Sequence, residues 1–205
     1  MEYTTLASDA SLAKTIAALE ANNIHSVIVP NRREALEKVK TLIPKGASVM
    51  NGSSRTLEEI GLVDYLKEGT HGWDNFHEKI FAEKDPAKQG ELRKQGLLTD
   101  YYLGSVHALT ENGELFIASN TGSQLGNIVF GSQQLIFVVS TQKIVPDLAS
   151  AFARVKDHVL ALEDVNMQQK YGMGTMHSKT FIMNKEPAFM GRTVTVVFVS
   201  EKLGF

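Results

Sequence analysis

The stretch HSVIVPNRREALEKVKTLIPKGASVM, residues 25–50, decides the fold class. Its first part, residues 25–29, is a short apolar run that Pro30 closes, which is typical of a buried strand. Asn31 can cap a helix whose apolar residues recur at helical spacing. A second short strand pattern follows over residues 47–50. This alternation of strands and helices predicts an α/β protein with a mainly parallel sheet flanked by helices.

The same alternation continues on both sides of this stretch. Apolar spacing predicts a helix over residues 9–22, capped by Asp9, and another over residues 145–161. Residues 95–102 are expected to end a further helix. Strand patterns then crowd together at 105–110, 114–119, 134–140 and 192–199. No repeat, low-complexity tract or linker interrupts the chain, so residues 1–205 are expected to form a single domain.

Composition excludes several classes of protein. The 205 residues carry a net charge of −2, so there is no basic excess for nucleic-acid binding. Cysteine is absent, which excludes a disulfide framework, a cysteine nucleophile and a thiolate-held iron–sulfur cluster on this chain. The longest apolar run, residues 135–139, is too short to span a bilayer. No signal peptide is evident, and a cytoplasmic location without membrane contact is expected.

The first candidate site is the loop Gly52-Ser53-Ser54-Arg55-Thr56, which follows a predicted strand and precedes a helix. In parallel α/β sheets, ligands bind at the carboxyl ends of the strands. The glycine permits close approach of the backbone, and the hydroxyl groups and helix N-terminus suit an anion. An ordinary helix cap, with Thr56 and Glu59 as a capping box, is the alternative.

A carboxylate at a predicted turn is the second candidate. Glu111 lies in Thr110-Glu111-Asn112-Gly113, between two apolar strands. Asn-Gly between such strands is a strong hairpin signal, so the motif has a purely structural interpretation. In the functional interpretation, Glu111 acts as a base or a nucleophile at a strand end.

Two further loops combine glycine with polar side chains. Residues 119–127 contain Asn120, Thr121, Gly122 and Ser123, whose backbone N–H groups could form an anion site, or the segment is a surface loop.

Residues 171–180 contain His177, Ser178, Lys179 and Thr180, which could supply a cation and hydroxyl donors. A flexible loop is the alternative there. The glycines that precede His177 do not form a dinucleotide-binding fingerprint, because the third glycine is missing.

Histidine spacing gives only a weak indication of metal. His71, Asp74 and His77 could meet on a helix, but Gly72 and the following tryptophan make that helix uncertain, so no metal site is predicted. His107 lies within a strand pattern and is expected to be packed or hydrogen-bonded rather than a ligand. The sequence leaves the identity of any cofactor unknown.

Together these loops resemble the lactate-utilization (LUD) domain family, which includes lactate utilization protein C. Residues 52–61, GSSRTLEEIG, are similar to the family's Gly-Ser-x-Thr…Glu-x-Gly segment. Residues 103–117 are similar to its Ala-Glu-Thr-Gly-Thr segment, with Glu111 at the Glu. Two further segments are similar to those of the family: Lys143-Ile144-Val145, which precedes a helix with an apolar face, and the ending at residues 201–205.

The resemblance implies a NagB/RpiA/CoA-transferase-like fold and a link to the oxidation of lactate to pyruvate. It further implies partner proteins that hold iron–sulfur clusters. We expect the ligand to be a small anionic organic acid or a phosphate-bearing compound. A homo-oligomer is left open. One departure stands out: residues 176–184 keep the Ser and Thr of the family's Gly-Pro-Ser-x-Thr-Ala-Asp-Ile-Glu segment but lack its Gly-Pro and acids, which indicates a different ligand.

The wider fold offers an alternative function. Residues 110–113 are similar to the Ser-Glu-Asn-Gly motif of coenzyme A transferases, in which the Glu is the nucleophile, and Gly122 would lie in their oxyanion loop. A stand-alone CoA-transferase-like or sugar-phosphate-type enzyme that uses Glu111 is therefore the second hypothesis. In either case, we expect loops 51–56, 119–127 and 175–180 to converge on one cleft, with Glu111 at its edge.

Overall fold

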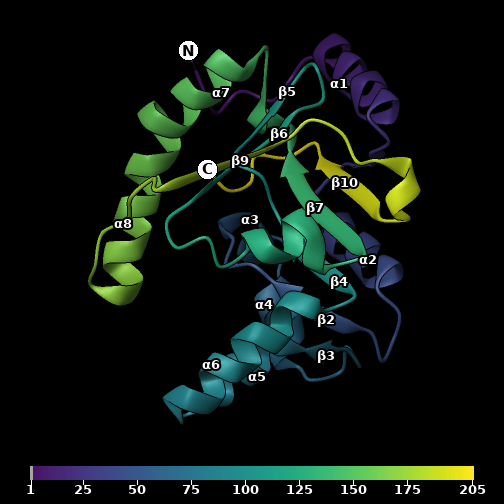
Figure 1. Cartoon of the computed structure of the whole chain (residues 1–205). Coiled ribbons are helices and arrows are strands. Elements are labelled where there is room, and N and C mark those ends of the chain that lie inside the picture. The colour runs from purple at the N-terminus through teal and green to yellow at the C-terminus, as the bar shows by residue number, and fades with distance from the viewer. Residues whose placement is uncertain (1) are drawn as a thin grey trace.

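The computed structural model describes residues 2–205 and contains a six-stranded parallel sheet, sheet A, at its centre (Figure 1). All neighbouring strands in sheet A pair in parallel. This confirms the predicted α/β class. The order across the sheet is β1 (His25–Val29), β10 (Thr193–Val199), β7 (Gln134–Ser140), β4 (Tyr101–Gly104), β2 (Ser48–Asn51) and β3 (Asp74–Asn75).

A second, four-stranded sheet, sheet B, was not expected as a separate layer. Its order is β8 (Ile144–Val145), β5 (Ala108–Thr110), β6 (Leu115–Ser119) and β9 (Lys179–Met183). Strands β5 and β6 pair in antiparallel fashion, which confirms the hairpin. Gly113 closes its turn with φ of 83°, and an added Cβ would lie 3.0 Å from the backbone of Ala18, so only glycine fits.

The helices are mostly short. They are α1 (Asp9–Ala21), α2 (Arg32–Leu42), α3 (Arg55–Glu59), α4 (Leu62–Lys67), α5 (Phe76–Ala82), α6 (Pro86–Gln95), α7 (Leu148–Arg154) and α8 (Leu160–Tyr171). A π-helical turn, η4 (Val155–Val159), joins α7 to α8. The helix predicted over 145–161 is thus confirmed from residue 148 onward and extends to residue 171, whereas Val145 belongs to strand β8. Single turns η1 (Gly96–Leu98), η2 (Asn127–Gly131), η3 (Thr141–Lys143) and η5 (Ala188–Met190) connect other elements.

Three local predictions were wrong. Ser8, not Asp9, caps α1, because the Ser8 hydroxyl accepts a hydrogen bond from Ser11 N. The segment expected to end a helix over 95–102 instead turns at η1 and enters strand β4. The end of the loop expected over 171–180 is a strand, because Lys179 and Thr180 begin β9 on the edge of sheet B.

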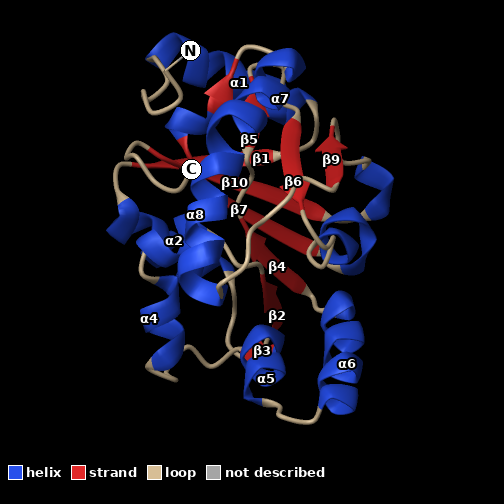
Figure 2. Cartoon of the chain, turned by 90° about the vertical axis from the view of Figure 1, so that its left-hand side faces the viewer, coloured by secondary structure: helices blue, strands red, loops and turns tan. Residues whose placement is uncertain are grey.

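Figure 2 shows the sheets and the helices around them, and three clusters of buried apolar side chains hold these layers together. Helices α2, α3 and α4 cover one face of sheet A. Helix α1 and sheet B cover the opposite face, and α7 with η4 packs on the outer side of sheet B. Because both faces of the sheet are covered at its centre, strands β7 and β10 are almost continuously buried rather than alternating.

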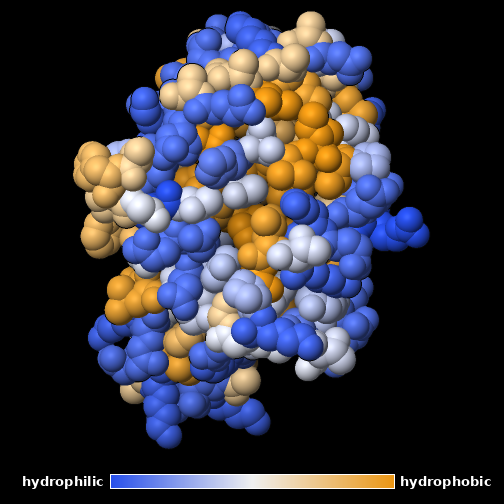
Figure 3. All heavy atoms as spheres, turned by 90° about the vertical axis from the view of Figure 1, so that its right-hand side faces the viewer, coloured by the Kyte–Doolittle hydropathy of each residue, from blue (hydrophilic) through white to orange (hydrophobic). Residues whose placement is uncertain are grey.

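Part of the surface remains apolar. Exposed large hydrophobic side chains include Ile28, Val129, Phe130 and Phe189. Figure 3 shows hydrophobic residues gathered over the upper part of the face on the right of Figure 1. Surfaces of this kind often contact other proteins, and a homo-oligomer stays a prediction. Within the described part of the chain, none of the helices combines the length and apolarity needed to cross a membrane.

Candidate functional site

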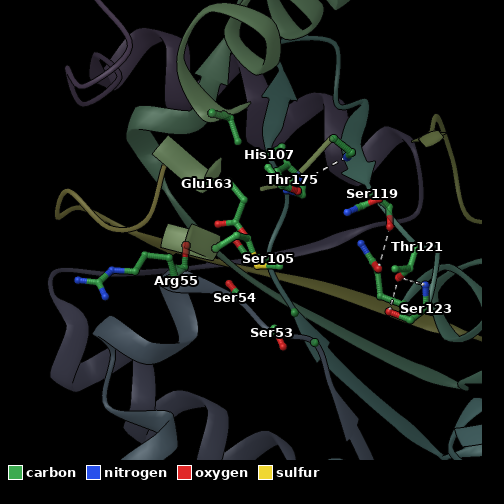
Figure 4. A pocket seen from close by; sticks show the side chains of 18 of the residues that line it. Ser53, Ser54, Arg55, Ser105, His107, Ser119, Thr121, Ser123, Glu163 and Thr175 are labelled. Atoms are coloured by element: carbon green, nitrogen blue, oxygen red, sulfur yellow. Dashed lines mark hydrogen bonds between the residues drawn. The ribbon is translucent and has the colours of Figure 1, made fainter. Parts of the chain in front are cut away.

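A cleft of about 350 Å³ opens at the carboxyl ends of the parallel strands of sheet A (Figure 4). Residues at and after the ends of β2 and β4 form one side, and the loop that follows β6 and helix α8 form the other. Lys143, at the end of η3, lies at its inner end. The volume is in the range of ordinary small-molecule sites.

The loop after β2 lines this cleft as predicted. Gly52 approaches Tyr102 so closely that an added Cβ would lie 2.6 Å from the tyrosine hydroxyl oxygen. Ser53 and Ser54 border the cleft, whereas the Arg55 side chain extends away from them (Figure 4) and pairs with Glu59 at 2.7 Å.

The predicted capping box in this loop is wrong. The Ser54 hydroxyl caps α3 by accepting a hydrogen bond from Leu57 N. Thr56 instead lies inside the helix with a buried hydroxyl group that faces Lys143. The Glu59 carboxylate accepts hydrogen bonds from Arg55 and from Gly204 N near the chain end.

Lys143 is the group that sequence reasoning missed as a site residue. Its side chain is only 4% exposed, and Nζ donates to Thr56 Oγ1 at 2.9 Å and to Ser105 Oγ and Val106 O at 3.2 Å. None of these acceptors is charged, and no carboxylate within residues 2–205 forms an ion pair with Nζ. Burial, together with the nearby Arg154 cation, lowers the pKa of Lys143 to about 7.

His107 supplies a neutral donor beside this lysine. Its Nδ1 accepts a hydrogen bond from Ala118 N at 3.1 Å, which assigns the ring proton to Nε2. Burial and the cations of Lys143 and Arg154 lower the pKa of His107 to about 3. The imidazole therefore stays neutral near pH 7. It is hydrogen-bonded, as the sequence indicated, and it also lines the cleft.

Arg154 lies behind His107 and is completely buried. Its Nη1 donates to the carbonyl oxygen of His107 at 2.6 Å, while Nε and Nη2 have no hydrogen-bond partner among the described residues. Burial lowers the pKa of Arg154 to about 10, so it remains a cation at neutral pH.

Glu163 on α8 is the acidic residue that lines the cleft among residues 2–205. Its side chain is directed toward Ser105 (Figure 4). Burial raises the pKa of the Glu163 carboxyl group, because desolvation disfavours its charged form. The same lining contains three basic side chains, those of Arg55, Arg93 and Lys143.

The loop after β6 also reaches the cleft. Asn120, Thr121 and Ser123 line it. The Ser119 hydroxyl accepts a hydrogen bond from Gly122 N at 2.9 Å and donates to Gln124 Oε1 at 3.0 Å. Gly122 has φ of 85° and shapes the loop without lining the cleft.

The predicted site over 177–180 is only partly at the cleft. His177 lines it, and its Nε2 lies 2.7 Å from Thr180 Oγ1. Ser178, Lys179 and Thr180 lie outside the lining. Lys179 and Thr180 begin strand β9, and Ser178 directly precedes it. Lys179 Nζ donates to the backbone oxygen of Asn120 and so supports the neighbouring loop.

The structure places Glu111 outside the cleft. Its carboxylate accepts hydrogen bonds from Ser11 Oγ at 2.6 Å and Lys14 Nζ at 2.9 Å, both on α1. The Ser11 hydrogen bond is the main cause of its lowered pKa. Glu111 and Gly122 therefore do not form the nucleophile and oxyanion loop that the coenzyme A transferase motif implied.

The three residues with metal-like spacing do not share a site. His71 is buried, accepts from Trp73 N and lies beside Glu78, whereas Asp74 pairs with Lys79. His77 stacks on Phe81 near the outer end of the cleft. Within residues 2–205, no three acidic or histidine side chains converge as a metal site.

Comparison with known proteins agrees with the family resemblance in the sequence. A family model described as the LUD domain matches residues 12–199 and confirms the resemblance in the motifs. The fold is similar to that of a DUF162 family protein from Deinococcus radiodurans. The TM-score is 0.57 at 11% identity, over 96% of this chain and 100% of that chain.

A weaker structural match carries no argument about this chain. It is to eIF2B delta from Chaetomium thermophilum, with a TM-score of 0.37 at 14% identity, and it covers 70% of this chain and 57% of that chain. No curated protein matches the sequence. The parallel sheet flanked by helices is consistent with the NagB/RpiA/CoA-transferase-like fold that the resemblance implies.

Proposed function

The chain belongs to the LUD domain family, and we propose that this lactate-utilization-associated protein binds a small organic acid anion in the cleft. The ligand's carboxylate lies beside Lys143 and accepts a hydrogen bond from His107 Nε2. Ser53, Ser54 and the loop after β6 surround the rest of the ligand.

The observation that carries this proposal is the missing counter-ion of Lys143. Buried charges in proteins are normally paired, because an isolated ion loses its hydration energy. Lys143 has three neutral oxygen acceptors and no carboxylate, yet it borders a cavity. An anion in the cleft would compensate a charge that the described residues leave unpaired.

The absence of cysteine suits a cluster-free subunit. In this proposal, the chain binds the acid, and iron–sulfur partner proteins carry the electrons when lactate is oxidised to pyruvate. The alternative enzyme that uses Glu111 has no support from the geometry, because α1 holds that carboxylate outside the cleft.

Isothermal titration calorimetry near neutral pH tests the proposal, with lactate, pyruvate and malate as probes. We expect at least one acid to bind the wild type and Lys143→Met to weaken that binding about tenfold or more. Lys67→Met is the matched control, because Lys67 is exposed on α4. Absence of binding by all three acids, or equal binding by Lys143→Met, would contradict the proposal.

A further inference from the structure

Two cations lie at or behind the inner end of the cleft, and neither has a carboxylate partner within residues 2–205. Lys143 contacts only neutral oxygen atoms. Arg154 contacts the carbonyl oxygen of His107 and leaves Nε and Nη2 unpartnered, although the side chain is completely buried. The fold thus places two positive charges where water cannot screen them well.

The neutral ring between these cations reflects their combined field. Burial is the main cause of the lowered pKa of His107, and the two cations and His177 lower it further. Its Nδ1 is fixed by Ala118 N, so it offers a hydrogen to the cleft without adding charge. The ring can therefore donate to a ligand oxygen without reducing the charge that the ligand has to balance.

The neighbouring acids do not balance the two cations. Glu59 is close enough to raise the pKa of Lys143 slightly, but Arg55 and Gly204 N occupy its oxygens. Among the described residues, Glu163 forms no ion pair with either cation; its Oε2 accepts a hydrogen bond from Asn166, and burial raises the pKa of its carboxyl group. A ligand with one negative charge would offset only one of the two buried cations. The cleft, at about 350 Å³, also has room for more than a three-carbon acid.

We infer that the cleft selects a dianion, either a phosphate monoester or a dicarboxylate, over a monoanion of similar size. The inference rests on the proposed function, since it specifies the charge of the ligand at the same site. One part of the ligand's charge lies against Lys143 and the His107 Nε2–H group. The remainder is stabilised by Arg154 through the field behind His107, so Arg154 acts as a positioning residue without touching the ligand.

Two matched pairs of probes test this inference by calorimetry near neutral pH. Methyl phosphate, a dianion, is compared with dimethyl phosphate, a monoanion, and malate is compared with lactate. We expect the dianion of at least one pair to bind about tenfold or more tightly than its monoanion. The pair that shows the preference distinguishes a phosphate ester from a dicarboxylate.

Variants of Arg154 separate its charge from its packing. Arg154→Met should reduce the preference for the dianion to about threefold or less, while Arg154→Lys retains it. Arg33→Met, an exposed change on α2, is the control. If Arg154→Met does not fold, two measurements still test the inference: the preference of the wild type for the dianion, and the retention of that preference in Arg154→Lys.

Each outcome has a distinct meaning. Equal affinity for both members of each pair in the wild type would overturn the inference and leave anion binding intact. Binding of none of the four probes would overturn the inference. Absence of binding by lactate, pyruvate and malate would overturn the proposed organic-acid function, whereas tighter binding of methyl phosphate than of dimethyl phosphate would still support the inference. An unchanged preference in Arg154→Met would remove Arg154 from the explanation and overturn the inference as stated.

Discussion

Replacing Lys143 with Met should weaken the dependence of folding stability on pH in the alkaline range. The pKa of this lysine is about 7 in the folded protein, against 10.5 for an unperturbed lysine. A difference of about 3.5 units, at about 1.36 kcal/mol per unit, means that charged Lys143 costs the fold about 5 kcal/mol relative to an exposed lysine. Since the side chain is 4% exposed, solvent screening reduces this figure little.

The direction of the effect follows from proton binding. Between about pH 7 and pH 10.5, the unfolded chain holds a proton at Lys143 that the folded chain releases. Stability therefore rises with pH in this window. From about pH 7 to pH 9, the contribution of Lys143 to the free energy of unfolding should increase by about 2 kcal/mol. The Met variant lacks this contribution.

Urea unfolding at about pH 7 and pH 9, in buffers without small organic anions or phosphate, measures this difference for wild type, Lys143→Met and Lys67→Met. Near pH 7, the Lys143→Met protein should be at least as stable as wild type, because an apolar chain replaces an unpaired buried cation. The carbonyl of Val106 loses its donor, which offsets about 1–3 kcal/mol of the gain. If Lys143→Met shows the same rise in stability with pH as wild type, the lysine is not the buried titrating group.

Three further changes probe other parts of the site. In wild type, stability should fall as pH decreases from about 6.5 toward 3, because the unfolded chain protonates His107 while the folded chain does not. The His107→Asn variant should show a smaller fall in melting temperature over the same range. Its side-chain oxygen can still accept the hydrogen bond from Ala118 N. Gly52→Ala should destabilise the protein by about 1–3 kcal/mol through its contact with the Tyr102 hydroxyl, and Tyr102→Phe should restore part of the loss in chemical denaturation. Glu111→Gln should change stability by less than about 1 kcal/mol, because the Lys14 side chain that pairs with Glu111 is largely exposed. Calorimetry should find ligand binding unchanged. Loss of ligand binding in this variant would show that Glu111 belongs to the binding site.

The fold was predictable where both faces of a strand are buried. Strands β7 and β10 begin and end at or within a residue of the predicted strand patterns, because parallel strands covered on both sides have no polar face to interrupt them. Strand β4 was missed, since its apolar residues follow a helical pattern without a break. Strand β9 was missed because its first residues are polar and exposed at the edge of sheet B.

The site was predictable only where local composition signals it. The loops around Ser53 and Asn120 combine glycine with hydroxyl groups at strand ends, and the structure brings both to one cleft. Lys143 and His107 carry no such signal: Lys143 ends a short polar turn without glycine, and His107 lies within an apolar strand pattern. Only the arrangement of the strands brings them together. Glu111 has a strong local motif, yet the tight hairpin turn directs its side chain to α1.

The two unpaired cations also lower the stability of the fold. Native proteins are stable by only about 5–15 kcal/mol, and charged Lys143 alone opposes folding by a substantial part of that range. Anion binding should reverse this effect, because a negative ligand favours the charged form of Lys143 and raises its pKa. Ligand binding near pH 7 would then be accompanied by uptake of a proton at Lys143. The affinity for the ligand would decrease as pH rises above the pKa of Lys143 in the ligand-free protein. Calorimetry in two buffers of different ionisation enthalpy measures that proton directly, and binding without proton uptake would show that Lys143 is already fully charged in the empty cleft.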